Sequence, residues 1–173
     1  KLNETGADGF IPARTIGDDY FQYHEGAHAM IGRRTGETYR LGDHVANLQA
    51  LIDAVAAALS DRTPLALEGH GTKRTLGRTV KAEAVLKLSG LTGITMYEPD
   101  EMVFTARAGT PLAEIEAALA RQGQMLAFEP TGANATIGGI VAAGINGPRR
   151  FAAGAARDHL LGFHAVNSTG EQF

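Results

Sequence analysis

The chain has 173 residues, enough for one domain or two small ones, and its 44% hydrophobic and 20% charged residues are typical of globular proteins. It contains no cysteine, which excludes disulfides, thiolate metal sites and thiol nucleophiles and agrees with a cytoplasmic location. A net charge of −3 argues against nucleic-acid binding, and the lack of a long apolar run argues against a membrane-spanning segment.

Residues 1–45 are rich in turns and strand-like runs, and aromatic and polar residues alternate at 20–23. This pattern predicts short antiparallel strands. The segment resembles part of the OB-fold RNA-binding domain of RNase R-type exoribonucleases, through the motifs GFIP at 9–12, GDDY at 17–20, HAMIGRRTG at 28–36 and YRLGD at 39–43. The resemblance implies a barrel fragment without the strands that carry much of the nucleic-acid face, so we expect no RNA binding.

Residues 24–28 read HEGAH and match the H-E-x-x-H pattern of zinc hydrolases. On a helix, this spacing places His24 and His28 on one face beside Glu25 as a general base, and Asp43 or His44 could add a third ligand. The central glycine and the strand-like flanks instead favour a turn with solvated side chains. A zinc-dependent hydrolase is therefore the alternative function, and the turn is the favoured interpretation.

The second segment begins with apolar residues at helical spacing, which predict a helix from Val45 to Leu59 that ends before Pro64. A short strand at 65–67 follows, and then a glycine-rich loop at 69–78. Glycines allow the backbone to approach a ligand closely, so consecutive N–H groups can converge on a phosphate. Three cations of this loop could assist: Lys73, Arg74 and Arg78. A plain connecting loop is the alternative.

Further strands are predicted at 84–89 and at 94–107, the second interrupted by a turn at 98–101. Thr110 and Pro111 then precede a helix that ends at Gly123, with Leu112, Ile115, Ala118 and Leu119 on one face. Residues 125–128 return as a strand. This alternation predicts an α+β or α/β arrangement of layers, unlike a barrel.

The same segment resembles the vanillyl-alcohol-oxidase type of flavin domain, as in the FAD-binding subunit of glycolate oxidase. The motifs are PLALEGHGTKRTLGR at 64–78, the run at 88–130, ATIGGIVAAGINGPRR at 135–150 and AGAARDHLLGFHAV at 153–166. The resemblance implies an FAD cofactor whose pyrophosphate is held by the loop from Gly69 to Gly77, specifically by Gly69, His70, Gly71, Thr72 and Lys73. It also implies that Thr136, Gly138, Gly139 and Gly144 approach the isoalloxazine and ribityl groups.

Other polar candidates lie near the C-terminal end. His159 and His164 are five residues apart, which on a strand places them on opposite faces and argues against a shared metal. Asp158 beside His159, together with Arg149 and Arg150, could form a polar pocket. A solvated loop is the commoner outcome for such a cluster.

The expected fold is therefore α+β, with an antiparallel OB-fold fragment at 1–45 followed by a partial FAD-binding domain of the PCMH type at 46–173. We expect a flavin- or nucleotide-binding domain fused to an RNA-binding-domain fragment, both incomplete, with the parent oxidation of 2-hydroxy acids lost. A non-enzymatic chimera is a further alternative. Because cut sheets expose unpaired edges, we also expect a homo-oligomer.

Overall fold

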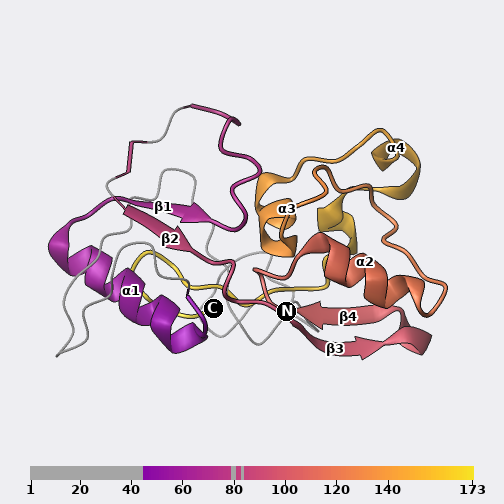
Figure 1. Ribbon diagram of the computed structural model, residues 1–173, viewed down its shortest axis with the longest axis horizontal. Helices are drawn as coiled ribbons and strands as arrows, with labels where there is room; N and C mark the ends of the chain where they lie inside the picture. The colour runs from indigo at the N-terminus through magenta and orange to yellow at the C-terminus, as the bar shows by residue number, and fades with distance from the viewer. Residues whose placement is uncertain (1–44, 79–80, 83) are drawn as a thin grey trace.

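The computed structural model describes residues 45–78, 81–82 and 84–173, which are drawn in colour in Figure 1. The expectations for the first segment, including the OB-fold fragment and the zinc ligands His24 and His28, lie outside the described residues, as do Asp43 and His44. In the described part, helices combine with small sheets, which confirms the mixed α+β class at this coarse level. None of the described helices is long and apolar enough to span a bilayer.

Helix α1 (Leu48–Asp61) begins after its cap residue, three positions later than the apolar spacing predicts. The Asn47 side chain accepts a hydrogen bond from the Ala50 N–H at 2.9 Å, which satisfies a donor of the first turn. Val45 is fully buried but lies outside the helix, where its N–H donates to the Lys87 carbonyl at 2.9 Å. The cap, rather than the apolar pattern, therefore sets the start of α1.

Strands β1 (Leu65–Glu68) and β2 (Ala84–Lys87) form a parallel pair, with their first residues opposite each other and their last residues likewise. Figure 1 shows α1 beside this pair. Burying each large aliphatic side chain between them contributes about 1.5–3 kcal/mol. The resulting first core cluster consists of Val45, Leu51, Ala54, Val55, Ala58, Leu65, Ala84, Leu86, Leu88, Leu91 and Val166.

Strands β3 (Ile94–Glu98) and β4 (Val103–Ala106) form an antiparallel hairpin closed by the 3-10 turn η1 (Pro99–Glu101), as the sequence predicts. Helix α2 (Leu112–Ala120) lies alongside this hairpin in Figure 1. Three residues of its predicted apolar face, Leu112, Ile115 and Leu119, are buried, and Ala118 is half-buried. The helical pattern at this position is therefore confirmed.

The remaining elements are short: α3 (Ile137–Ala143), α4 (Arg150–Ala153) and the 3-10 helix η2 (Ala156–His159). They pack near α2, and Figure 1 places them on the side away from the hairpin. The second core cluster consists of Ala106, Leu112, Ile115, Leu119, Leu126, Phe128, Ala135, Ile137, Ile140 and Ala156.

The predicted strand at 125–128 is wrong, because this stretch has no regular structure. A nearby side chain occupies its carbonyl groups: Arg149 Nη2 lies 3.5 Å from the Leu126 oxygen and 3.3 Å from the Phe128 oxygen. His159 likewise does not lie on a strand, since this residue ends η2. In both stretches, backbone groups form their hydrogen bonds locally or with side chains instead of with a neighbouring strand.

The segments that follow β2 and β4 contact each other, and this contact links the two parts of the core. The Gly109 N–H donates to the Leu91 carbonyl at 2.6 Å. Thr110 is fully buried, and its hydroxyl donates to the Gly93 carbonyl at 3.0 Å and accepts from the Gly93 N–H at 2.9 Å. These bonds tie the segment before α2 to Leu91 of the first cluster and to Gly93 at the start of β3.

Candidate functional site

The glycine-rich loop leaves the end of β1 and passes close to the start of α3 (Figure 1). Gly71 and Gly77 adopt left-handed φ values of +68° and +77°, which glycine tolerates best. From Gly69 to Lys73, no backbone N–H donates to another residue in the described part of the chain. Among the described residues, the loop therefore has a run of backbone donors without a protein acceptor, which suits a phosphate.

Three contacts join this loop to the segment at 131–136. His70 Nδ1 lies 2.9 Å from the Asn134 carbonyl oxygen, so this nitrogen carries the proton. Lys73 Nζ donates to the Thr131 carbonyl at 3.1 Å. The Cα of Gly69 packs directly against the Thr136 side chain. The structure thus brings together the two groups of predicted site residues, which are more than 60 positions apart in the case of His70 and Asn134.

Arg74 does not extend toward the open donors. Its Nε donates to Glu68 Oε2 at 2.7 Å, and its Nη2 also contacts that oxygen. The Glu68 side chain is only 17% exposed, whereas the Arg74 side chain is 65% exposed. Among the cations predicted to assist a phosphate, Arg74 is therefore held by an acidic partner, while Lys73 lies on the side of the 131–136 segment.

The second predicted group, around α3, has fewer open donors. The N–H of Ile137 donates to the Thr110 carbonyl at 3.0 Å, and that of Gly138 donates to the Ala108 carbonyl at 2.8 Å. The Gly139 N–H bonds to the Thr136 hydroxyl at 3.3 Å, which caps the helix. The N–H groups in the first turn of α3 are therefore already hydrogen-bonded within the protein. Gly138 is also buried.

Gly144, the last residue of the predicted group, ends α3 with a left-handed φ of 60°, and its N–H donates to the Ile140 carbonyl at 3.1 Å. It is exposed, and no atom lies within 4 Å of where a Cβ would stand. Open space therefore remains next to its backbone.

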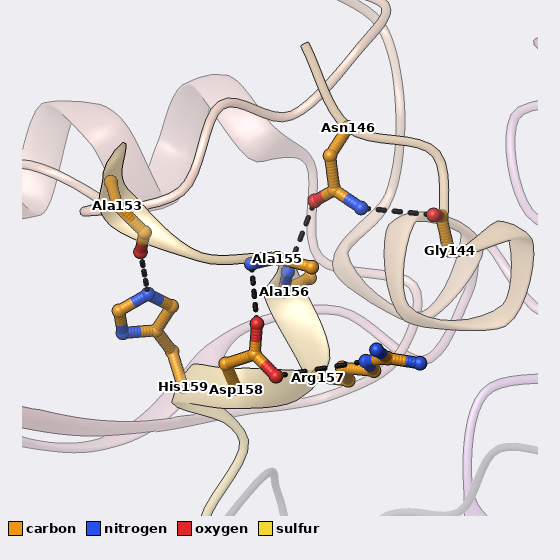
Figure 2. Close-up of polar contacts among 8 residues, drawn as sticks. All are labelled: Gly144, Asn146, Ala153, Ala155, Ala156, Arg157, Asp158 and His159. Carbon is orange, nitrogen blue, oxygen red and sulfur yellow. Dashed lines mark hydrogen bonds and ion pairs between the residues drawn. The ribbon is translucent and has the colours of Figure 1, made fainter. Parts of the chain in front are cut away.

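Asn146 is a structural residue that the sequence analysis missed (Figure 2). Its Nδ2 donates to the Gly144 carbonyl at 2.9 Å, and its Oδ1 accepts from the Ala156 N–H at 3.0 Å. Its backbone also bridges to Pro130. One side chain thus holds the end of α3 against the start of η2. The only sequence signal for this role is that the Asn146 side-chain amide, which can both donate and accept, stands within a glycine-rich motif.

Glu129 is a second missed residue. Its Oε2 accepts from the Arg149 N–H at 2.9 Å, and its carbonyl accepts from the Gly147 N–H at 3.0 Å. A Cβ at Gly147 would collide with the Glu129 carboxylate. Glycine at this position therefore lets the carboxylate hold the turn before α4.

The polar pocket considered as an alternative for His159, Asp158, Arg149 and Arg150 is not formed, and separate local contacts occupy these side chains. His159 Nε2 lies 2.6 Å from the Ala153 oxygen, and Asp158 Oδ2 accepts from the Ala155 N–H at 2.7 Å (Figure 2). Arg149 reaches the irregular stretch at 125–128, and the Arg150 guanidinium lies 6.0 Å from the ring centre of Phe151. These groups shape backbone turns.

Asp158 should give the chain a small acid-sensitive contribution to stability. The Ala155 N–H is the main cause that lowers the pKa of this carboxyl below its ordinary 3.8, with Arg157 and His159 assisting. Because the folded pKa lies below the unfolded one, the contribution is present above the ordinary value and is lost as pH falls through the folded pKa. We expect the melting-temperature difference between wild type and Asp158→Asn to shrink on acidification. A difference that stays constant with pH would contradict this expectation.

Two other features of the described residues lie away from the glycine-rich loop or are absent. No group of three or more His, Asp or Glu residues suitable for a metal occurs in the described ranges, so the zinc alternative gains no support there. A pocket of about 320 Å³ lies beside the end of α2, and none of its lining residues belongs to the loop. It is lined by Glu116, Ala120, Gln124, Met125, Leu126, Phe128, Pro130 and Arg149.

Comparison with known proteins assigns the chain to a family. A family model described as an FAD binding domain matches residues 43–173. The chain belongs to this FAD-binding family. Glycolate oxidase subunit GlcE of Escherichia coli (strain K12) is 47% identical over 125 residues, which cover 71% of this chain and 35% of that protein. The FAD-binding chain thus spans about a third of that relative's length.

Ribonuclease R of Aquifex aeolicus (strain VF5) is 35% identical over 72 residues, which cover 42% of the chain and 10% of that protein. Both resemblances seen in the sequence are therefore confirmed, and together they are consistent with a chimera. No solved structure matches the chain. The proposed boundary between residues 45 and 46 stays a prediction.

Proposed function

We propose that this FAD-binding domain holds the pyrophosphate of FAD at the loop from Gly69 to Lys73. The observation that carries the proposal is the run of backbone N–H groups there with no acceptor in the described part of the chain. Such a run, with a lysine at its end, matches a diphosphate in charge and geometry. When bound, FAD would supply the capacity to accept a hydride or electrons.

We infer that Thr136 and Gly139 contribute by shaping the site, because the Thr136 hydroxyl caps α3 and its side chain packs on Gly69. Gly144 is the member of the predicted flavin-lining group with open space beside it, which supports a close approach of the flavin or ribityl group. Gly138 would support the site without donating to the cofactor, since its N–H is already bonded to the Ala108 carbonyl. The pyrophosphate is accordingly assigned to the loop and not to the start of α3.

Lys73 provides the direct test of this proposal. We expect the wild-type chain to bind FAD in calorimetry and to quench its fluorescence, and Lys73→Met to weaken binding about tenfold through loss of a charged phosphate contact. Lys87→Met, which changes a lysine on β2, is the matched control and should leave FAD affinity unchanged. Riboflavin, which lacks phosphate, should bind both proteins equally. A wild-type chain that ignores added FAD would exclude the proposed function.

Three further expectations stay predictions: loss of 2-hydroxy-acid oxidation, a cytoplasmic location and self-association. Self-association has some support in the two-stranded sheets, because among the described strands each has a ladder partner on one side only. Binding of FAD does not depend on any of these three.

A further inference from the structure

Glu68 is the last residue of β1 and lies directly beneath the turn at Gly71. A Cβ at Gly71 would meet Glu68 Oε1 at 3.0 Å and Arg74 Nε at 3.3 Å. The ion pair of Glu68 and Arg74 therefore lies against Gly71 on the side where a Cβ would project, which we call the inner side of the turn. This arrangement places a carboxylate within a few residues of the site assigned to a diphosphate.

The pairing decides the charge that the loop offers to an anion. With the pair intact, Glu68 and Arg74 cancel, and Lys73 remains as the cation directed toward the 131–136 segment. Glu68 is half-buried and Arg74 is exposed, which makes the carboxylate the fixed member of the pair and the guanidinium the member that could move. An isolated Glu68 would repel a phosphate, and an isolated Arg74 would attract one.

We propose that Glu68 is a specificity-determining residue of the phosphate loop. By holding Arg74 on the inner side of the turn, it keeps the loop suited to the modest negative charge of a dinucleotide diphosphate and disfavours more highly charged phosphates. This inference rests on the proposed function, because it assumes that a phosphate binds at Gly69 to Lys73. The repulsion from Glu68 increases with the charge of the ligand, so its effect should follow ligand charge.

The test compares Glu68→Gln and Arg74→Gln with three ligands: riboflavin, FAD and inorganic pyrophosphate. We expect Glu68→Gln to tighten FAD binding about threefold and pyrophosphate binding by more, since Arg74 is then free and the carboxylate charge is gone. Arg74→Gln should weaken FAD binding about threefold and pyrophosphate binding by more. Riboflavin affinity should not change in either variant. All differences should diminish at high salt.

Glu98→Gln on β3 and Arg121→Gln after α2 are the matched controls, and they should leave all three affinities unchanged. Thermal unfolding separates a structural role from the proposed one, because loss of the pair should lower stability in both variants while changing FAD affinity in opposite directions. Affinities that change in the same direction, or that change for riboflavin, would overturn the inference.

The failure of this inference differs from the failure of the proposed function. If wild-type protein binds FAD but both variants bind every ligand as wild type does, the role of Glu68 is overturned and FAD binding stands. If wild-type protein binds neither FAD nor pyrophosphate, both are overturned.

Discussion

Replacing Gly69 with alanine is expected to weaken FAD binding by at least about tenfold and to destabilise the fold by about 1–3 kcal/mol. The new Cβ would collide with the Thr136 hydroxyl and lie 3.2 Å from its Cγ2, so either the loop or the start of α3 must move. Each movement separates the loop from the segment at 131–136. Calorimetric titration with FAD and denaturant unfolding measure the two effects.

Thr136→Ala supplies the control for this prediction, because it removes the two nearest side-chain atoms and leaves only the Thr136 Cβ, at an ordinary contact distance of 3.4 Å. Alone, it should cost about 1 kcal/mol through loss of the α3 cap. In the Thr136→Ala background, the further cost of Gly69→Ala should be clearly smaller than in wild type, which a double-mutant cycle measures. Equal costs in both backgrounds would show that Gly69 matters for another reason.

The larger loss of stability is expected at Gly109, where the two core clusters meet. An alanine Cβ would collide with the Leu88 carbonyl and lie 2.6 Å from the Leu91 carbonyl. Both are backbone atoms, and the Gly109 N–H is itself bonded to Leu91. Since a backbone cannot rotate away as a side chain does, we expect Gly109→Ala to destabilise the chain by about 3 kcal/mol or more. Denaturant unfolding followed by circular dichroism checks this value.

Gly123→Ala is the matched control for Gly109. Gly123 has a left-handed φ of +66°, but no atom lies within 4 Å of where its Cβ would stand. The substitution should therefore cost only the backbone strain of about 1–2 kcal/mol. A loss at Gly123 as large as that at Gly109 would show that the close approach at Gly109 is not the cause.

Elements with a strong local signal could be predicted from the sequence. The apolar spacing of Leu48, Leu51 and Val55 identifies α1, and the Glu98 to Glu101 turn divides β3 from β4. The glycine-rich motif also locates the loop whose N–H groups at 69–73 have no acceptor among the described residues. In each case, residues close together in sequence determine the structure, so that periodicity and turn chemistry suffice.

Contacts between distant residues could not be predicted in this way. The interaction of Arg149 with the carbonyls at 126 and 128 replaced a predicted strand, and nothing in residues 125–128 reveals it. The double hydrogen bond of Asn146 depends on how α3 and η2 lie in space. The pairing of Glu68 with Arg74 was missed for another reason: a cation in a glycine-rich loop was assumed to be available to a ligand.

The separation of the core into two clusters has a consequence for how the protein opens. β1, which precedes the loop, belongs to the first cluster, and Ile137 of α3 belongs to the second. Each cluster can act as its own cooperative unit, joined to the other by the contacts around Gly109 and by those between the loop and the 131–136 segment. A dinucleotide that contacts both the Gly69–Lys73 loop and the open space beside Gly144 would touch both units at once. Its binding energy would then suppress their independent fluctuations and make the two halves unfold as one.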